Sequence, residues 1–197
     1  MSRRDSTFRI RPMEGRDIPA VVSLDRRIFR DPWPESAYVQ EIYFNPDAHY
    51  FVLELLDPTQ VRTWHAHRRR QSARLLGFVG MRVEGTRGHI STLAVRPEWR
   101  GQDLGETLLL IAIDEAIKHG AHLVGLEVRV SNTVAQSLYA KYDFETHTRL
   151  HKYYADGEDA LYLQARLNTD KQLCSRVRER LATLIEALQV SCVQREA

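Results

Sequence analysis

The fold is decided by one continuous stretch near the middle of the chain, Leu93-Ala94-Val95-Arg96-Pro97-Glu98-Trp99-Arg100-Gly101-Gln102-Asp103-Leu104-Gly105. Residues 89–95 alternate loosely between apolar and polar side chains and are bounded by Gly88 and Pro97, which predicts a strand. From Leu104 to Lys118 the apolar residues recur at the spacing of a buried helical face. The stretch therefore predicts a strand, a glycine-containing loop and a helix, in that order.

This junction has the chemistry of an anion site. The first backbone N–H groups of a helix lack partners inside the helix, and the positive end of the helix dipole lies at the same place. A phosphate or pyrophosphate group is therefore a suitable ligand for the loop and for the helix start at Leu104.

The same residues carry a resemblance to a family. The pattern Arg100-x-x-Asp103-x-Gly105 resembles the Arg/Gln-x-x-Gly-x-Gly/Ala signature of the GNAT acetyltransferases, with aspartate in place of the first glycine. The resemblance covers roughly residues 7 to 167, and its RimI-type branch acetylates the N-terminal amine of a ribosomal protein. Further residues that match this branch are Leu126-Glu127-Val128-Arg129-Val130-Ser131-Asn132, Ala135, Leu138-Tyr139, Phe144, Tyr153-Tyr154 and Glu158-Asp159-Ala160.

The resemblance implies an α/β protein with the GNAT fold. Its central sheet is mixed and mostly antiparallel, with about seven strands and one splayed parallel pair, and helices flank both faces. Residues 1–167 are expected to form this domain, and residues 168–197 an appended C-terminal helix. A strand, helix and strand in sequence give a parallel pair with a right-handed crossover. Ligands bind beyond the carboxyl ends of such strands, which here means beside Val95 and Val130.

Periodicity predicts the remaining elements. Asp17 and Asn132 each precede a predicted helix and are expected to cap it. The strands are expected over 7–11, 50–56, 75–84, 90–95, 122–130, 144–154 and 159–167. The helices are expected over 18–29, 35–43, 104–118 and 133–142.

Residues 57–74 form an insertion that is too long for a tight turn between two strands. It holds five arginines and two histidines, so it is either a solvated, mobile segment or a contact for an acidic partner or RNA. The net charge of +2 gives no general argument for nucleic acid binding. His65 and His67 lack a third ligand at a recognisable spacing, so no metal is expected.

The C-terminal segment has a helical apolar stripe, which either packs on its own domain or forms a homodimer contact. Cys174 and Cys192 both lie in this segment. On one continuous helix they would be about 27 Å apart and could not form a disulfide. With no apolar run of membrane-spanning length and no apolar core for a targeting segment, a reducing cytoplasmic setting is expected. The stripe consists of Leu173, Val177, Leu181, Leu184, Ile185 and Leu188.

Two residues are expected to perform the chemistry. Strand alternation places Glu127 opposite Leu126 and Val128, so Glu127 faces a cleft if those two are buried. The resemblance implies that Glu127 is the general base and Tyr139 the acid that protonates the departing thiolate. The alternatives are a surface carboxylate paired with Arg129 and a tyrosine that only packs its ring.

The resemblance also implies acetyl-CoA as co-substrate, with no metal. Backbone groups of the strand end would hold the pantetheine arm, and the loop and helix start would hold the pyrophosphate. Asn132 matches a residue that contacts the cofactor, although capping alone also explains it. The residues implied for the strand are Leu93, Ala94 and Val95, and those for the loop and helix start are Arg100, Gly101, Gln102, Asp103, Leu104, Gly105 and Glu106.

Three residues depart from the family pattern. Asp103 and Asp143 replace glycines, and Glu106 stands where a basic residue is often found. Aspartate tolerates left-handed backbone angles, so the loop is expected to form with the Asp103 side chain turned outward towards Arg100. For Asp143 we expect a small cost in stability only.

The acceptor is expected to bind near Trp33, Tyr153 and Tyr154, and acidic groups at Glu158-Asp159 would suit a basic N-terminal peptide. Core packing explains Trp33 and the tyrosine pair equally well. The leading hypothesis is an acetyltransferase for the N-terminal α-amine of a ribosomal or other protein. The alternatives are an enzyme for a small-molecule amine and a binding module in which Asp103 has impaired cofactor binding.

Overall fold

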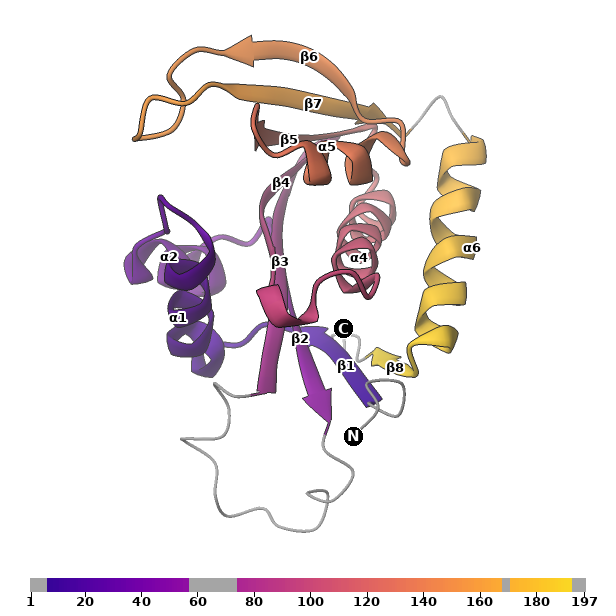
Figure 1. Ribbon diagram of the computed structural model, residues 1–197. Helices are drawn as coiled ribbons and strands as arrows, with labels where there is room; N and C mark the ends of the chain where they lie inside the picture. The colour runs from indigo at the N-terminus through magenta and orange to yellow at the C-terminus, as the bar shows by residue number, and fades with distance from the viewer. Residues whose placement is uncertain (1–6, 57–73, 168–170, 193–197) are drawn as a thin grey trace.

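An eight-stranded sheet runs through the protein and separates two groups of helices (Figure 1). The computed structural model describes residues 7–56, 74–167 and 171–192. The strand order is β6-β7-β5-β4-β3-β2-β1-β8. The strands are β1 (Thr7–Pro12), β2 (Ala48–Leu56), β3 (Leu75–Glu84), β4 (Arg87–Val95), β5 (Leu123–Arg129), β6 (Glu145–Leu150), β7 (Ala160–Arg166) and β8 (Val190–Cys192).

Each face of the sheet has its own hydrophobic core. On one face the sheet packs against α1 (Ile18–Ile28) and α2 (Glu35–Phe44). On the other face it packs against α4 (Leu104–Lys118) and α6 (Lys171–Ala187). The helix α5 (Thr133–Ala140) follows β5, and two short 3₁₀ turns, η2 (Gly15–Asp17) and η4 (Pro97–Trp99), complete the helical elements of the described residues.

The predicted fold class is confirmed, with one correction in the sheet. The helix α4 has the predicted bounds, and β4 and β5 form the predicted parallel pair. The sheet has eight strands instead of about seven, because the three-residue strand β8 pairs in parallel with β1. Periodicity could not reveal so short a strand. The insertion at 57–74 lies outside the described residues except for Arg74.

The apolar stripe of the C-terminal helix packs on its own domain. Leu173, Val177, Leu181 and Leu184 are buried in the same core as α4. This is the intramolecular alternative of the two that the sequence left open. No helix within the described residues combines the length and the apolar character of a membrane span.

The prediction for Cys192 is wrong. The helix α6 ends at Ala187, Gln189 takes a left-handed backbone conformation, and Cys192 lies in β8. The distance inferred from one continuous helix therefore does not apply. Cys174 and Cys192 are nevertheless both free thiols.

A buried charge network joins the first strand to its neighbours. The guanidinium of Arg11 binds both oxygens of Asp17 at 2.6 and 2.8 Å, and Glu54 Oε1 at 2.7 Å. All three side chains are buried. Asp17 therefore does not cap α1 as predicted, because its carboxylate accepts from Arg11 and from the Glu14 amide instead.

The network shifts the pKa values of its members. Burial alone would lower the pKa of Arg11, but the hydrogen bonds and charges of Asp17 and Glu54 outweigh burial and raise it. Burial alone would raise the pKa of Glu54, but Arg11 and Arg9 lower it. The stabilisation from Glu54 is therefore complete above the ordinary carboxyl pKa and is lost as the pH falls through the lowered value.

Removal of Arg11 tests the importance of this network. We expect Arg11→Ala to lower the free energy of unfolding by about 3–5 kcal/mol, because two buried carboxylates lose their cation. Arg9→Ala is the matched control: Arg9 binds the same Glu54 but is partly exposed, so its loss should cost about 1 kcal/mol or less. Urea unfolding at neutral pH measures both, and equal losses would contradict the assignment.

Candidate active site

The site begins where β4 and β5 diverge. The two strands pair only at Arg87–Leu123, Gly88–Val124 and His89–Gly125. Beyond these positions β4 continues along β3, and β5 continues along β7 to its end. The carboxyl halves of β4 and β5 therefore face each other with backbone groups that the sheet does not pair, and such groups are available to a ligand.

The loop after β4 presents amides at the start of α4. Gly101 and Asp103 both have left-handed backbone angles, with φ of 71° and 57°. The Asp103 carbonyl accepts hydrogen bonds from Thr107 N and Oγ1, each at 2.9 Å, while its side chain makes no capping bond. The first amides of α4 are thus open to an anion, and the expectation that aspartate could adopt the required angles is confirmed.

Two further observations fit a phosphate-bearing ligand. The buried Nε2 of Gln102 has no hydrogen-bond partner among the described residues. A Cβ added to Gly105 would meet only Val95 Cγ2, at 3.8 Å, so the space above this glycine is open. A phosphate oxygen is the kind of acceptor that an unsatisfied amide donor such as Gln102 Nε2 lacks.

The expected pair between Asp103 and Arg100 does not form in the described part of the chain. Arg100 Nε donates instead to the carbonyl oxygen of Val95 at 3.2 Å and so ties the loop back to β4. Asp103 is exposed; the hydrogen bond to Glu106 is the main cause of the raised pKa of Arg180 on α6, and the charge of Asp103 adds a smaller contribution. The side chain is therefore turned outward as expected, but its cationic neighbour is Arg180.

The side chain of Glu106 is held by two residues that directly follow α5 and by one residue of α6. It accepts hydrogen bonds from Tyr142 Oη at 2.5 Å, Lys141 Nζ at 3.2 Å and Arg180 Nε at 3.3 Å. Burial alone would raise the pKa of Glu106, but these three donors outweigh it and lower the pKa. Two cations thus compensate the carboxylate near the anion site, and only the backbone of Glu106 remains a candidate for cofactor binding.

Glu127 lies on the side of β5 opposite its buried neighbours Leu126 and Val128, as alternation predicted. Its side chain is 19% exposed, and Glu127 Oε2 lies 2.8 Å from His89 Nε2. This contact orients one carboxylate oxygen. The predicted alternative, a pair with Arg129, does not occur, because Arg129 binds Asp156 and Glu158.

Tyr139 projects from α5 into the core and packs against Phe144, with ring centroids 5.8 Å apart. Burial, with a smaller contribution from Tyr154, raises the pKa of Tyr139 to about 12. The phenol therefore stays protonated throughout the physiological range.

Ion pairs and a ring contact of Arg129 join the connection between β6 and β7 to the end of β5. Arg129 binds Asp156 at 2.9 Å and Glu158 at 2.8 Å, and its guanidinium lies 3.8 Å from the centroid of the Tyr154 ring. Tyr153 and Tyr154 form an edge-to-face pair with centroids 5.1 Å apart. Tyr153 is half exposed, so its ring is available to a ligand.

The acidic residues of this connection already have partners. Arg149 binds Asp159 at 2.7 Å, and Arg30, from the segment after α1, lies 3.6 Å from Asp156. The Arg30–Asp156 contact brings the α1–α2 segment beside the β6–β7 connection. Because arginines balance these carboxylates, the expected acidic surface for a basic peptide is largely neutralised.

Two predicted site residues have well-defined packing or capping roles. Trp33 is partly buried, packs on Tyr38 with centroids 5.6 Å apart, and donates its amide to Asp25 at 2.7 Å. Asn132 Oδ1 caps α5 by accepting from the Ala135 amide at 3.2 Å. Their predicted ligand contacts therefore remain predictions.

Some residues of the site were missed from sequence. His89 is one, because nothing in the alternating strand pattern pairs it with a glutamate 38 positions later. Gln136 is another: its Nε2 donates to the carbonyls of Arg129 and Val130 at 3.0 and 2.9 Å, which fixes α5 to the end of β5. The only sequence signal for Gln136 was its position one helical turn after the predicted cap Asn132, which places both side chains on the same face of α5.

A splayed parallel pair, an amide-rich loop before a helix and a carboxylate on the strand beside it are the features that the GNAT resemblance implied. The model of the Acetyltransferase (GNAT) family matches residues 18–144, more than half of the chain. The protein therefore belongs to this family, as the sequence signature predicted.

Comparison with individual proteins shows which GNAT acetyltransferases this chain resembles. The putative [ribosomal protein bS18]-alanine N-acetyltransferase of Bacillus subtilis (strain 168) is 34% identical over 160 residues, which are 81% of this chain and 95% of that protein. The crystal structure of the ribosomal-protein-S18-alanine N-acetyltransferase from Escherichia coli superposes with a TM-score of 0.67 at 27% identity, covering 84% of this chain and 97% of that one. The structure of the NatC complex bound to Gag peptide and CoA shares the fold, with a TM-score of 0.66 and 22% identity over 82% and 99% of the two chains. The RimI-type resemblance and the prediction of an N-acetyltransferase are thus confirmed.

The aspartate in the loop gives a direct test of the anion site. We expect Asp103→Gly to tighten acetyl-CoA binding about two- to fivefold, because it removes an exposed negative charge beside the amides that would face the pyrophosphate. Asp143→Gly is the matched control, since Asp143 has nearly the same backbone angle, φ 58°, but lies after α5. Calorimetry with both variants measures the change; an unchanged or weaker affinity for Asp103→Gly would count against this site.

Proposed function

We propose that the protein transfers the acetyl group of acetyl-CoA to the N-terminal α-amine of a protein in the cytoplasm, most specifically a ribosomal protein. The relatives named above support the acceptor class, and a solved structure with the same fold contains CoA and a peptide. The observation that carries the proposal is the placement of Glu127 at the edge of the diverging strands, opposite its buried neighbours Leu126 and Val128. Two residues further along β5, the guanidinium of Arg129 lies 3.8 Å from the centroid of the Tyr154 ring, which ties the tyrosine pair to the same strand end.

The strand ends and the loop would hold the cofactor. Those backbone groups of Leu93, Ala94 and Val95 that neither β3 nor Arg100 engages would bind the pantetheine arm, and the amides of Leu104 and Gly105 would bind the pyrophosphate. Gln102 supplies a further donor. A strand amide aimed at the thioester carbonyl would stabilise the charge that develops on its oxygen.

Glu127 would supply the neutral amine. An N-terminal α-amine has an ordinary pKa of about 7.7 to 8.0, so a large part of it is protonated at neutral pH. Glu127 takes this proton directly or through a water, and the nitrogen lone pair attacks the acetyl carbon. The C–N bond forms as the C–S bond breaks, and the second amine proton leaves towards solvent.

Tyr139 would act on the departing sulfur. A phenol with a pKa of about 12 is 3 to 4 units less acidic than an ordinary thiol, whose pKa is about 8.5. Complete proton transfer to the thiolate would therefore be uphill by about 5 kcal/mol. Tyr139 is better suited to donate a hydrogen bond that stabilises the thiolate until solvent protonates it.

A small-molecule amine is the second candidate acceptor. The neutralised carboxylates of the β6–β7 connection disfavour a polyamine, whose several positive charges need unpaired acidic groups. The exposed ring of Tyr153 favours an acceptor with backbone and side-chain surface, such as a peptide.

The acceptor is tested by direct competition between substrates. Purified protein with acetyl-CoA is assayed by mass spectrometry on peptides that begin with alanine, on the same peptides with blocked N-termini, and on spermidine. We expect acetylation at the free N-terminus only. Acetylated spermidine, or acetylated lysine in the blocked peptide, would contradict the proposed acceptor, and the absence of every product would favour the binding module.

The role of Glu127 is tested by the dependence of rate on pH. We expect Glu127→Gln to lower kcat/KM by about 10²-fold near pH 6.5 and by much less near pH 9, where the amine is already neutral. His89→Gln is the matched control: it removes the contact with Glu127 but keeps the base, so the profile should keep its shape at a lower rate. If Glu127→Gln lowered kcat/KM by the same factor at every pH, Glu127 would not be the general base.

A further inference from the structure

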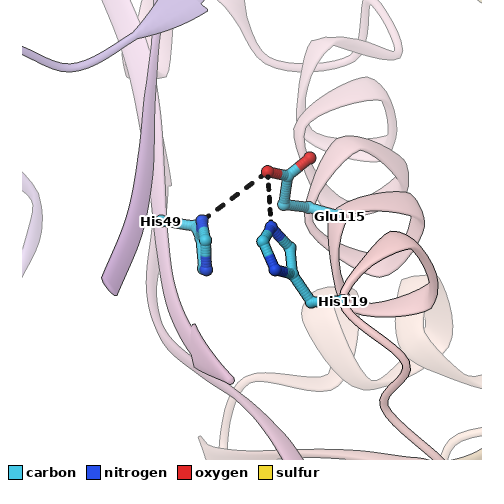
Figure 2. A group of neighbouring side chains, drawn as sticks. All are labelled: His49, Glu115 and His119. Atoms are coloured by element: carbon cyan, nitrogen blue, oxygen red, sulfur yellow. Dashed lines mark ion pairs between the residues drawn. The ribbon is translucent and has the colours of Figure 1, made fainter. Parts of the chain in front are cut away.

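A second group of chemically competent side chains lies at the opposite end of α4 from the acetyl-transfer site. His49 projects from β2, and Glu115 and His119 project from the last turns of α4 (Figure 2). One ligand atom of each residue lies within 4.8 Å of the other two. At about 1.5 Å per residue, Glu115 is about 16 Å along the helix from Leu104, so the two sites are separate.

The distances in this group fit metal coordination better than hydrogen bonding. Glu115 Oε1 lies 3.6 Å from His49 Nδ1 and 3.4 Å from His119 Nε2. Hydrogen bonds to nitrogen are usually about 2.7–3.2 Å long. Ligand atoms bound tetrahedrally at about 2.0–2.2 Å from zinc are about 3.3–3.6 Å from each other.

The two imidazoles lie side by side against one carboxylate oxygen. Their ring centroids are 4.1 Å apart, and both rings point to the same carboxylate oxygen, as Figure 2 shows. A cation placed between the three ligand atoms would accept a lone pair from each of them.

The surroundings provide support and access. Lys118 Nζ lies 3.6 Å from Glu115 Oε2, the oxygen that does not face the histidines, and 2.8 Å from Asp114. The spacing of Glu115 and His119 by four residues places both on one helical face, as in many helical metal sites. The His119 side chain is 45% exposed, so an ion could enter from solvent and keep a water as its fourth ligand.

We propose that His49, Glu115 and His119 form a binding site for a divalent transition metal of the zinc class, which joins β2 to the C-terminal end of α4. Two imidazoles and one carboxylate are a ligand set that zinc favours. The sequence-based expectation that no metal binds rested only on His65 and His67, which are close in sequence. This site was missed because its ligands are separated by 66 positions and meet only through the fold.

The test is zinc titration of the metal-free, full-length protein by calorimetry, in a His65→Ala/His67→Ala background that removes the other histidine pair. We expect one zinc per chain with micromolar or tighter affinity, weakened at least tenfold by His49→Ala and by His119→Ala. His151→Ala is the matched control, because this histidine also contacts a carboxylate, Asp159, but lies on the β6–β7 connection. The affinity of the His151→Ala variant for zinc should equal that of the parent.

Two additional readouts keep the outcome decisive if an alanine variant is unstable. Cobalt(II) added in place of zinc should give the parent protein the visible absorption spectrum of a tetrahedral site. Glu115→Gln preserves the shape of the side chain and should abolish this spectrum. At a hundredfold excess over Kd, zinc should raise the Tm of the parent by roughly 5 °C or more and leave the Tm of Glu115→Gln unchanged. No binding at roughly millimolar zinc, or equal affinity in the parent and the site variants, would overturn the proposal.

Discussion

The parting of β4 from β5 after the His89–Gly125 pair is the constraint on which the site depends. A continuous parallel ladder would satisfy the backbone groups of both strands and leave nothing for a ligand. Because β4 follows β3 and β5 follows β7, each strand is stabilised on its outer side while the inner edges remain open. The proposed cofactor site is therefore formed mainly by backbone groups, and side chains complete it.

Several hydrogen bonds fix the loop and helices around the diverging strands. Arg100 fixes the loop to β4, and Gln136 fixes α5 to the end of β5. Glu106 joins α4 to α5 and to the appended helix α6 through Tyr142, Lys141 and Arg180. The appended helix thus contributes to the site indirectly, by compensating a carboxylate that would otherwise face a bound phosphate.

Local patterns in the sequence were sufficient for the frame of the site. The bounds of α4, the capping role of Asn132 and the inward direction of Leu126 and Val128 follow from periodicity and helix-end chemistry, which depend on neighbours in the chain. The predicted chemical roles of Glu127 and Tyr139 came from the family resemblance. Alternation alone indicated only that Glu127 faces away from the core.

Contacts between distant residues could not be predicted. Arg11 looks like an exposed strand residue until η2 and β2 place two carboxylates beside it. The pairing of β8 with β1, the engagement of Glu127 by His89 and the meeting of His49 with α4 likewise depend on which elements become neighbours. Such contacts have no local signal, because their partners lie tens of residues away.

Binding of acetyl-CoA by the open edges of β4 and β5, with the loop before α4, is most directly tested by calorimetric titration of the purified protein with acetyl-CoA, with coenzyme A alongside. We expect one molecule per chain with an affinity in the micromolar range for both ligands. No heat of binding at millimolar acetyl-CoA would contradict the account, because neither the diverging strands nor the loop would then form a cofactor site.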